Sequence, residues 1–171
     1  ITYSSQSNIN LSSHIKHSIF ETHSFLLKND PTIIEYAAFF GSINIVKYLF
    51  LHDVELKPSL WLYAIHSKNA DLIHFLEENH VEPEDQSYYE CFQETVKCHH
   101  IDLSQYIQEN YTNYKNEIIN ENNFDTSIAS FSFRYYNFAF FPRNFYNFST
   151  LLYACQYDYL TLVKILMKTQ H

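Results

Sequence analysis

One stretch decides the fold class because it recurs along the chain: Tyr36-Ala37-Ala38-Phe39-Phe40-Gly41-Ser42-Ile43-Asn44-Ile45-Val46-Lys47-Tyr48-Leu49. A counterpart lies about 27 positions later, at residues 63–76, and the same frame returns at residues 153–166. A copy that matches this pattern less closely spans residues 94–107. The gap from Asp102 to Thr161 is about two periods, so we expect one further degenerate unit at roughly residues 114–141.

Each copy has the pattern of two short helices. Small residues in the first helix allow a neighbouring helix to approach closely, and apolar residues at helical spacing form one face of the second. The expected caps of the first helices are Thr32, Ser59 and Ser149, and the small residues of these helices are Ala37, Ala64 and Ala154. The expected caps of the second helices are Asn44, Asp71, Asp102 and Thr161. Neither helix hides its apolar face alone, so successive pairs must stack.

The chain must reverse between the two helices within about three residues, and a left-handed backbone position there favours Gly or Asn. Gly41 occupies this position in the first copy. Lys68, His99 and Asp158 occupy it in the others, so we expect strained or differently shaped turns there.

These units predict an all-α solenoid of stacked helix pairs forming a single domain over residues 1–171. We expect a frayed start at residues 1–11, an N-terminal capping helix within residues 12–30, and repeat units at residues 31–57, 58–86, 87–113, 114–144 and 145–171. The capping helix would run from His14 to Asn29 and turn Ile15, Ile19, Phe25 and Leu26 inward. The aromatic stretch at residues 131–148 fits helical and strand spacing alike, and helix is favoured because nothing else in the chain would pair with a strand.

Composition supports a helical, folded chain and disfavours two classes of partner. Hydrophobic residues make up 46% of the 171 residues, which argues against disorder. A single Gly and four Pro leave little material for the tight turns of antiparallel sheets. The net charge of -8, with no stripe of cations, disfavours nucleic acid and membrane surfaces.

The segment Thr32 to Gly41, followed by Ile45-Val46-Lys47-Tyr48-Leu49, resembles the ankyrin signature Thr-Pro-Leu-His-x-Ala-Ala-x-x-Gly and Val-Val-x-x-Leu-Leu. Ile33 stands in place of the proline, Glu35 in place of the histidine, and the period is shorter than in ordinary ankyrin repeats. The motifs Ser59-Leu60-Trp61, Tyr63-Ala64-Ile65-His66, Cys98-His99-His100 and Arg134-Tyr135-Tyr136-Asn137 are similar to those of an uncharacterised ankyrin-associated domain expanded in parasitic flagellate protists, and this resemblance covers nearly the whole chain. This second resemblance implies that further ankyrin repeats follow in the full-length chain.

Two cysteines and two histidines give the sequence its one candidate metal site. Thiolate and imidazole suit zinc, but Cys91, Cys98, His99 and His100 lack the usual spacing of two to four residues and a second pair of ligands. We therefore favour structural roles for them and expect no cofactor. The odd number of cysteines, with Cys155, indicates a reducing compartment, cytoplasmic or nuclear.

The favoured function is a protein–protein interaction module without catalytic activity. No glycine elbow or phosphate-binding loop is present in the sequence. Glu35, Phe39, Leu62 and His66 are the candidate partner-binding residues, because they fall on the outer side of first helices, where ankyrin-like stacks present a groove. The alternative is a capping or spacer segment of a longer ankyrin array, and zinc binding is a remote one.

Overall fold

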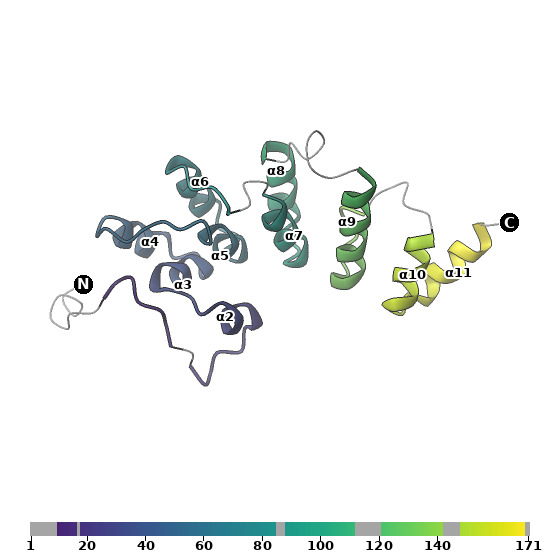
Figure 1. The fold of residues 1–171 in the computed structure, drawn as a ribbon, viewed down its shortest axis with the longest axis horizontal. Helices are drawn as coiled ribbons and strands as arrows, with labels where there is room; N and C mark the ends of the chain where they lie inside the picture. Colours follow the sequence, from purple (N-terminus) through teal and green to yellow (C-terminus); the bar gives the residue numbers. More distant parts are fainter. Residues whose placement is uncertain (1–9, 17, 85–87, 112–120, 142–147, 170–171) are drawn as a thin grey trace. The chain divides into compact units, whose positions relative to one another are not determined.

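A computed structural model describes residues 10–16, 18–84, 88–111, 121–141 and 148–169. Within these ranges the chain contains ten helices and no strand, which confirms the all-α prediction (Figure 1). The chain divides into two compact units, Ile1–Gln86 (unit 1) and Ser87–His171 (unit 2).

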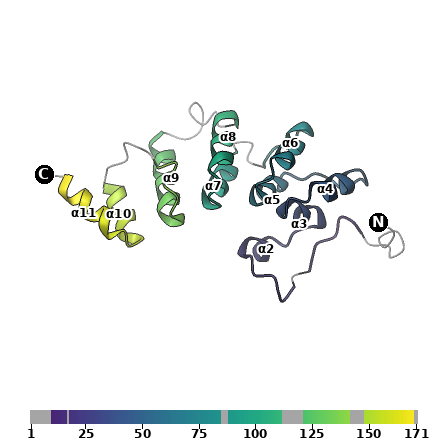
Figure 2. The same cartoon turned by 180° about the vertical axis from the view of Figure 1, so that it is seen from behind.

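Unit 1 consists of a short helix and two helix pairs. The short helix is α2 (Ser24–Asn29), and the pairs are α3 (Ile33–Phe39) with α4 (Ile43–Phe50), and α5 (Leu60–Ser67) with α6 (Ala70–Glu78). The helices of each pair pack against each other, and α3 also packs along α5, as the view from behind shows (Figure 2). The second helices begin at the N-caps Ser42 and Asn69, two residues before the predicted caps.

The turns between paired helices share one backbone shape. Gly41 and Lys68 have φ values of 68° and 53°, and in unit 2 His99, Tyr136 and Asp158 lie at 56–58°. The strain expected at non-glycine residues is therefore present, because left-handed backbone is unfavourable for residues with a Cβ atom. A different turn shape, the other possibility, is not observed.

A backbone hydrogen bond closes four of these five turns in the same register, whereas in the turn at Lys68 the Asn69 N–H donates to the Ser67 hydroxyl at 3.1 Å. The Ser42 N–H donates to the Ala37 carbonyl at 2.9 Å, and the His100 N–H donates to the Thr95 carbonyl at 3.0 Å. This is the bond of a Schellman motif, which satisfies the last carbonyls of a helix. The small residue four positions before the left-handed residue is buried in all five cases: Ala37, Ala64, Thr95, Ser132 and Ala154.

The second helices of unit 1 end in a related way. Val54 N–H donates to the Leu49 carbonyl at 3.1 Å, and Val81 N–H donates to the Leu76 carbonyl at 3.0 Å, while both valines are buried. The Trp61 indole N–H donates to the Val81 carbonyl at 2.6 Å. Trp61 is thus a core residue with its one polar group satisfied.

The N-terminal segment corrects the predicted capping helix. Only Ser24–Asn29 is helical, whereas the described residues before it form turns and an isolated bridge between His14 and Thr32. The Ile15 N–H donates to the Pro31 carbonyl at 2.8 Å, so this segment pairs with the residues that lead into α3 instead of forming a helix. Ile19, expected to face inward, is 91% exposed, while Leu26 is buried as expected.

Unit 2 contains α7 (Tyr89–Lys97) paired with α8 (Ile101–Tyr111), the single helix α9 (Glu121–Tyr135), and α10 (Phe148–Gln156) paired with α11 (Leu160–Thr169). Helix α9 packs against both α7 and α10. Because the left-handed residue Tyr136 follows it directly, α9 corresponds to the first helix of the degenerate unit. Residues 136–141 are turn and irregular structure, so the described part of this unit has no second helix; residues 112–120 and 142–147 lie outside the described residues.

The aromatic stretch is helical only in its first part. Phe131 to Tyr135 belong to α9, which confirms helix over strand there, and the helix ends at Tyr135. Phe133 is fully buried, and its ring contacts those of Phe138, Phe141, Tyr153 and Tyr159 at centroid distances of 5.3–6.0 Å. These ring contacts replace the second helix in covering this side of α9.

In two units, an Asn side chain directly after the left-handed residue bonds to the preceding repeat. Asn69 Nδ2 donates to the Gly41 carbonyl at 2.9 Å in unit 1. In unit 2, Asn137 Nδ2 donates to the Val96 carbonyl at 2.7 Å. These carbonyls lie at or near helix ends, where they lack intrahelical partners. This connection was not predicted, although an Asn at the same place in two units, Asn69 and Asn137, is its sequence signal.

Candidate partner-binding site

The four predicted partner-binding residues occupy equivalent positions in consecutive repeats. Glu35 and Phe39 are one helical turn apart on α3, and Leu62 and His66 have the same spacing on α5. Since α3 packs along α5, all four lie within one part of unit 1. Glu35 and Phe39 are buried, and Leu62 and His66 are half-buried. The expectation that all four point outward is therefore wrong for the two residues of α3.

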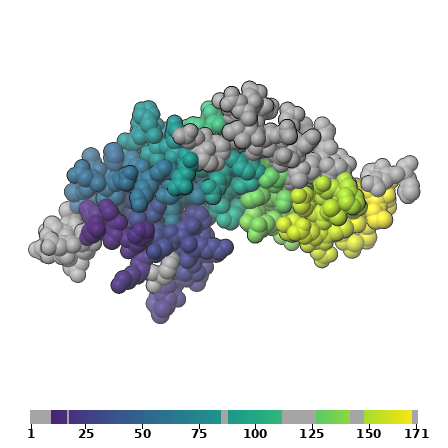
Figure 3. Space-filling model, in the orientation of Figure 1, coloured from purple at the N-terminus to yellow at the C-terminus, as the bar shows by residue number. Residues whose placement is uncertain are grey.

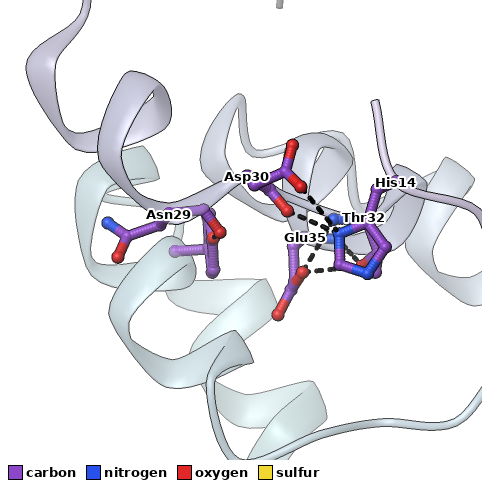
Figure 4. A network of polar contacts seen from close by, with 6 residues as sticks. His14, Asn29, Asp30, Thr32 and Glu35 are labelled. Atoms are coloured by element: carbon purple, nitrogen blue, oxygen red, sulfur yellow. Dashed lines mark hydrogen bonds and ion pairs between the residues drawn. The ribbon is translucent and has the colours of Figure 1, made fainter. Parts of the chain in front are cut away.

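Glu35 is held in a polar network with Thr32, which Figure 4 shows, and with Ser59. One carboxylate oxygen accepts from the backbone N–H and from the hydroxyl of Thr32, both at 2.8 Å. The other oxygen accepts from the Ser59 hydroxyl at 2.5 Å. The Glu35 N–H reaches back to the Thr32 hydroxyl at 3.5 Å, which completes a capping box at the start of α3.

This network gives Glu35 a structural task. It satisfies an orphan donor at the N-terminus of α3, and its negative charge lies at the favourable end of that helix. Through Ser59 it also connects the starts of α3 and α5. The spacing Thr32-x-x-Glu35 is the sequence signal of a capping box, and it was overlooked when Glu35 was assigned to a partner surface.

Next to this network, the chain around His14 is held by Asp30 (Figure 4). His14 Nδ1 lies 2.6 Å from the Asp30 carbonyl oxygen and 3.8 Å from its carboxylate. Asp30 has a left-handed backbone, with φ of 44°, which ends α2 and directs the chain into α3. The segment before α3 is thereby fixed on the scaffold that carries the candidate site.

An aromatic cluster contains two of the other three predicted residues, Phe39 and His66. It consists of His23, Phe25, Phe39, Tyr63 and His66, with centroid distances of 4.2–6.0 Å. Phe39 and His66 are brought together at 4.9 Å, as the prediction of a shared surface requires. His23 and Phe25, which the sequence analysis did not include, come from the start of α2 and pack over them.

Tyr63 connects this cluster to the chain before α3. Its hydroxyl donates to the Asn29 carbonyl at 3.5 Å. Burial, and then the charges of Glu35 and Asp30, raise the pKa of Tyr63 far above its ordinary value. The hydroxyl therefore stays protonated and available as a donor at every physiological pH.

Phe40 is the exposed edge of the cluster. Its ring contacts those of Phe39 at 5.0 Å and Tyr36 at 4.9 Å, and yet 57% of the residue is exposed. A large aromatic side chain that is exposed but backed by buried rings is typical of a binding anchor. The sequence analysis missed Phe40, because a position beside the turn gives no sign of its exposure.

The candidate zinc ligands do not converge. Cys91 and Cys98 are seven residues apart along α7 and its C-cap, which places them about 10 Å apart along the helix axis. Two sulfurs on one zinc ion would have to lie about 4 Å apart. Cys91 is also buried, whereas His99 is exposed in the left-handed turn. This geometry supports the structural roles favoured for these residues.

Cys98 is further disfavoured as a ligand or nucleophile by its protonation. Burial, and then the charge of Glu94, raise the pKa of the Cys98 thiol to about 12, while Lys97 opposes the shift. Lys97 Nζ is paired with the Glu94 carboxylate at 2.7 Å. Because the thiolate is the reactive and metal-binding form, Cys98 is inert at neutral pH.

Among the described residues, no helix combines the length and the apolar character needed to span a bilayer. Comparisons with protein-family models, curated proteins and solved structures found no match to this chain.

Proposed function

We propose that the chain is an ankyrin-like protein–protein interaction module that has no catalytic activity and binds a partner through the face around Phe40, Phe39, His66 and Leu62. The proposal of an ankyrin-like stack is supported by the recurrent sequence frame and by the equivalent left-handed turns. It is also supported by the packing of α3 along α5, both being first helices of their pairs.

The exposed Phe40 ring is the observation that carries the choice of face. Phe40 contacts Phe39, Phe39 contacts His66, and Leu62 lies one helical turn from His66. The exposed Phe40 is thus connected, through the buried Phe39, to the half-buried His66 and Leu62. The net charge of -8 favours a protein over a phosphate backbone as the partner.

The proposed binding mechanism is the rigid presentation of the side chains that contact the partner. The capping box at Thr32 and the ring cluster behind Phe40 hold the helices in place before any partner arrives. Side chains that are already ordered lose little conformational entropy on binding, so more of the contact energy appears as affinity. Three cysteines that form no disulfide are consistent with a reducing compartment, cytoplasmic or nuclear.

The experiment replaces exposed residues and leaves the core intact. A photo-reactive amino acid at position 40 identifies the protein that contacts this face, and recovery of that protein is then measured with the variants Phe40→Ser and Leu62→Ser. We expect each variant to lower recovery at least tenfold. Phe39 is left unchanged, because it is buried and its replacement would disturb folding.

The matched control is Leu51→Ser. Leu51 is 78% exposed directly after α4, so its replacement changes surface hydrophobicity away from the ring cluster. Recovery should be unchanged with this variant, and all variants should keep the wild-type helical signal. Equal recovery with Phe40→Ser and with Leu51→Ser would contradict the proposed face.

A further inference from the structure

The start of α2 packs on two residues of the candidate site. The His23 ring lies 4.8 Å from the Phe39 ring and 5.3 Å from the His66 ring, centroid to centroid. The Phe25 ring lies 6.0 and 4.2 Å from the same two rings. In the space-filling view, the N-terminal segment that includes α2, coloured purple, lies on the surface of unit 1 (Figure 3). His23 and Phe25 therefore cover Phe39, which is 9% exposed.

The helix that carries these two rings depends on its first hydrogen bonds. It has only six residues, Ser24–Asn29, and a helix of this length is not stable without help from its surroundings. Its N-cap is His23, whose Nδ1 accepts from the Phe25 N–H at 3.3 Å. The His23 carbonyl accepts from the Leu27 N–H at 3.1 Å. Since the usual N-cap residues are Ser, Thr, Asp and Asn, α2 begins at a cap that can change its charge.

The capping bond requires a neutral His23. A backbone N–H can only donate, so the Nδ1 atom that accepts from it carries no proton, and the proton of the ring lies on Nε2. A protonated imidazole has an N–H at both nitrogens and cannot accept. Histidine side chains in general gain their second proton between about pH 8 and 5. Acid therefore removes this cap and places a positive charge at the positive end of the helix dipole.

Two other histidines of unit 1 have the opposite arrangement. His14 Nδ1 lies 2.6 Å from the Asp30 carbonyl oxygen, and His52 Nδ1 lies 2.8 Å from the Tyr48 carbonyl oxygen. Because a carbonyl oxygen only accepts, these Nδ1 atoms already carry a proton, and their bonds persist when the ring gains another. Acid therefore acts on the start of α2, while His14 continues to hold Asp30 at its end.

The ionisable neighbours of His23 set the balance between the closed and the released state. The Glu21 carboxylate accepts from the His23 backbone N–H at 2.8 Å, and its charge favours a positive His23 ring. On α5, His66 opposes that charge whenever it is itself protonated, because the two rings touch. Tyr63 stays neutral in this pH range, because its pKa is raised far above it. The contact from α3 is Phe39, which does not titrate.

We propose that residues 23–27 form an acid-sensitive latch: protonation of His23 breaks the cap of α2 and releases its first turn from Phe39 and His66. The released state binds a proton that the capped state cannot bind, so a fall in pH favours release. Phe39 backs the exposed Phe40 ring at 5.0 Å, so release weakens partner binding at this face. This last consequence rests on the proposed function, whereas the release itself does not.

The release is measured without any partner. Hydrogen exchange at the Phe25 and Leu27 amides is followed by NMR in the 171-residue chain and corrected for the intrinsic rate at each pH. We expect protection to fall about fivefold or more from pH 7.5 to pH 5.5, the change that corresponds to loss of a typical N-cap. The 15N shifts of the His23 ring should show the proton on Nε2 at pH 7.5. A proton on Nδ1 at this pH would overturn the proposal.

Two replacements of His23 separate the cap from the ring packing. Asn accepts from the Phe25 N–H at every pH, so acid should cause no fall in protection in His23→Asn. Phe keeps a ring but has no acceptor, so His23→Phe should have low protection already at pH 7.5. High protection in His23→Phe would overturn the proposal, because packing and not the cap would then hold α2.

The matched control is His52→Asn, which replaces a histidine of unit 1 whose Nδ1 already carries a proton. This variant should show the same fall in protection as the wild type. No fall in the wild type, or an equal fall in His23→Asn, would overturn the latch.

The effect on binding is measured with the photo-reactive amino acid at position 40. We expect acid to lower recovery of the crosslinked protein about fivefold in the chain with His23, and less in the chain with His23→Asn. Equal losses in both would overturn the link between the latch and the binding face. The proposed function is tested separately, at pH 7.5, by Phe40→Ser against Leu51→Ser. Failure of that comparison leaves the exchange and NMR results intact, and failure of the latch leaves that comparison intact.

Discussion

The replacement Asn137→Ala tests whether the residue after the turn holds successive repeats together. Asn137 is 3% exposed, its Nδ2 donates to the Val96 carbonyl at 2.7 Å, and its Oδ1 accepts from the Ala139 N–H at 3.2 Å. Each such bond contributes about 0.5–1.5 kcal/mol net. The lost packing adds to this, so we expect the free energy of unfolding to fall by about 2–3 kcal/mol.

Urea unfolding, monitored by circular dichroism, measures the loss of unfolding free energy. The dependence of this free energy on urea concentration should be the same in wild type and variant, so that the same unfolding transition is compared. The matched control is Asn110→Ala: this Asn is exposed, and its Nδ2 donates within α8 to the Tyr106 carbonyl at 2.9 Å. We expect that control to change stability by less than about 0.5 kcal/mol. Asn137→Asp keeps an acceptor for Ala139 but removes the donor, so its loss should equal or exceed that of Asn137→Ala.

The reasoning is refuted if Asn137→Ala and Asn110→Ala lower stability equally. The bond to Val96 would then be a consequence of the packing between α7 and α9 and would not contribute to it. Hydrogen exchange gives a second measurement, because loss of the bond should increase exchange at the C-terminal end of α7 in the Asn137 variant alone.

Four further outcomes are expected. The variant Glu35→Ala removes three hydrogen bonds to a carboxylate, so the unfolding free energy should fall by about 2–4 kcal/mol in a denaturant titration. A fall of less than about 1 kcal/mol would contradict the structural role of Glu35. Lys68→Gly should raise stability by about 1 kcal/mol, since Gly tolerates φ of 53°, and a thermal melt that shows no gain would argue against strain at this turn. The raised pKa of Tyr63 contributes stability that is fully present below pH 10.0, the pKa of the unfolded state, and is lost as the pH rises above that value. The variant Tyr63→Phe should therefore lose less stability than the wild type between pH 9 and 11. Identical profiles of stability against pH would count against the raised pKa. At pH 8 iodoacetamide should modify Cys98 far more slowly than Cys155, and equal rates by mass spectrometry would contradict a pKa of about 12.

The candidate surface was only partly visible in the sequence. Helical spacing and repeat register correctly placed Phe39 near His66, because both depend on local periodicity. The burial of Glu35 and the exposure of Phe40 depend on which neighbouring segment covers each position. His23 and Phe25 reach this site from a segment that was predicted as part of a longer helix, so no periodic signal connected them to it.

The sequence by itself determined the helical class, the positions of the first helices and the register of the left-handed turns, since all of these follow from local propensity and apolar spacing. It also indicated that each unit needs neighbours, because no single pair can cover its own apolar face. Only the tertiary structure decided that residues before α2 pair with the entry to α3, that aromatic rings cover α9, and that Asn137 and Tyr159 bond to the preceding repeat. These features are contacts between residues far apart in sequence, whose energy appears only when the packed arrangement brings the groups within hydrogen-bond or van der Waals distance.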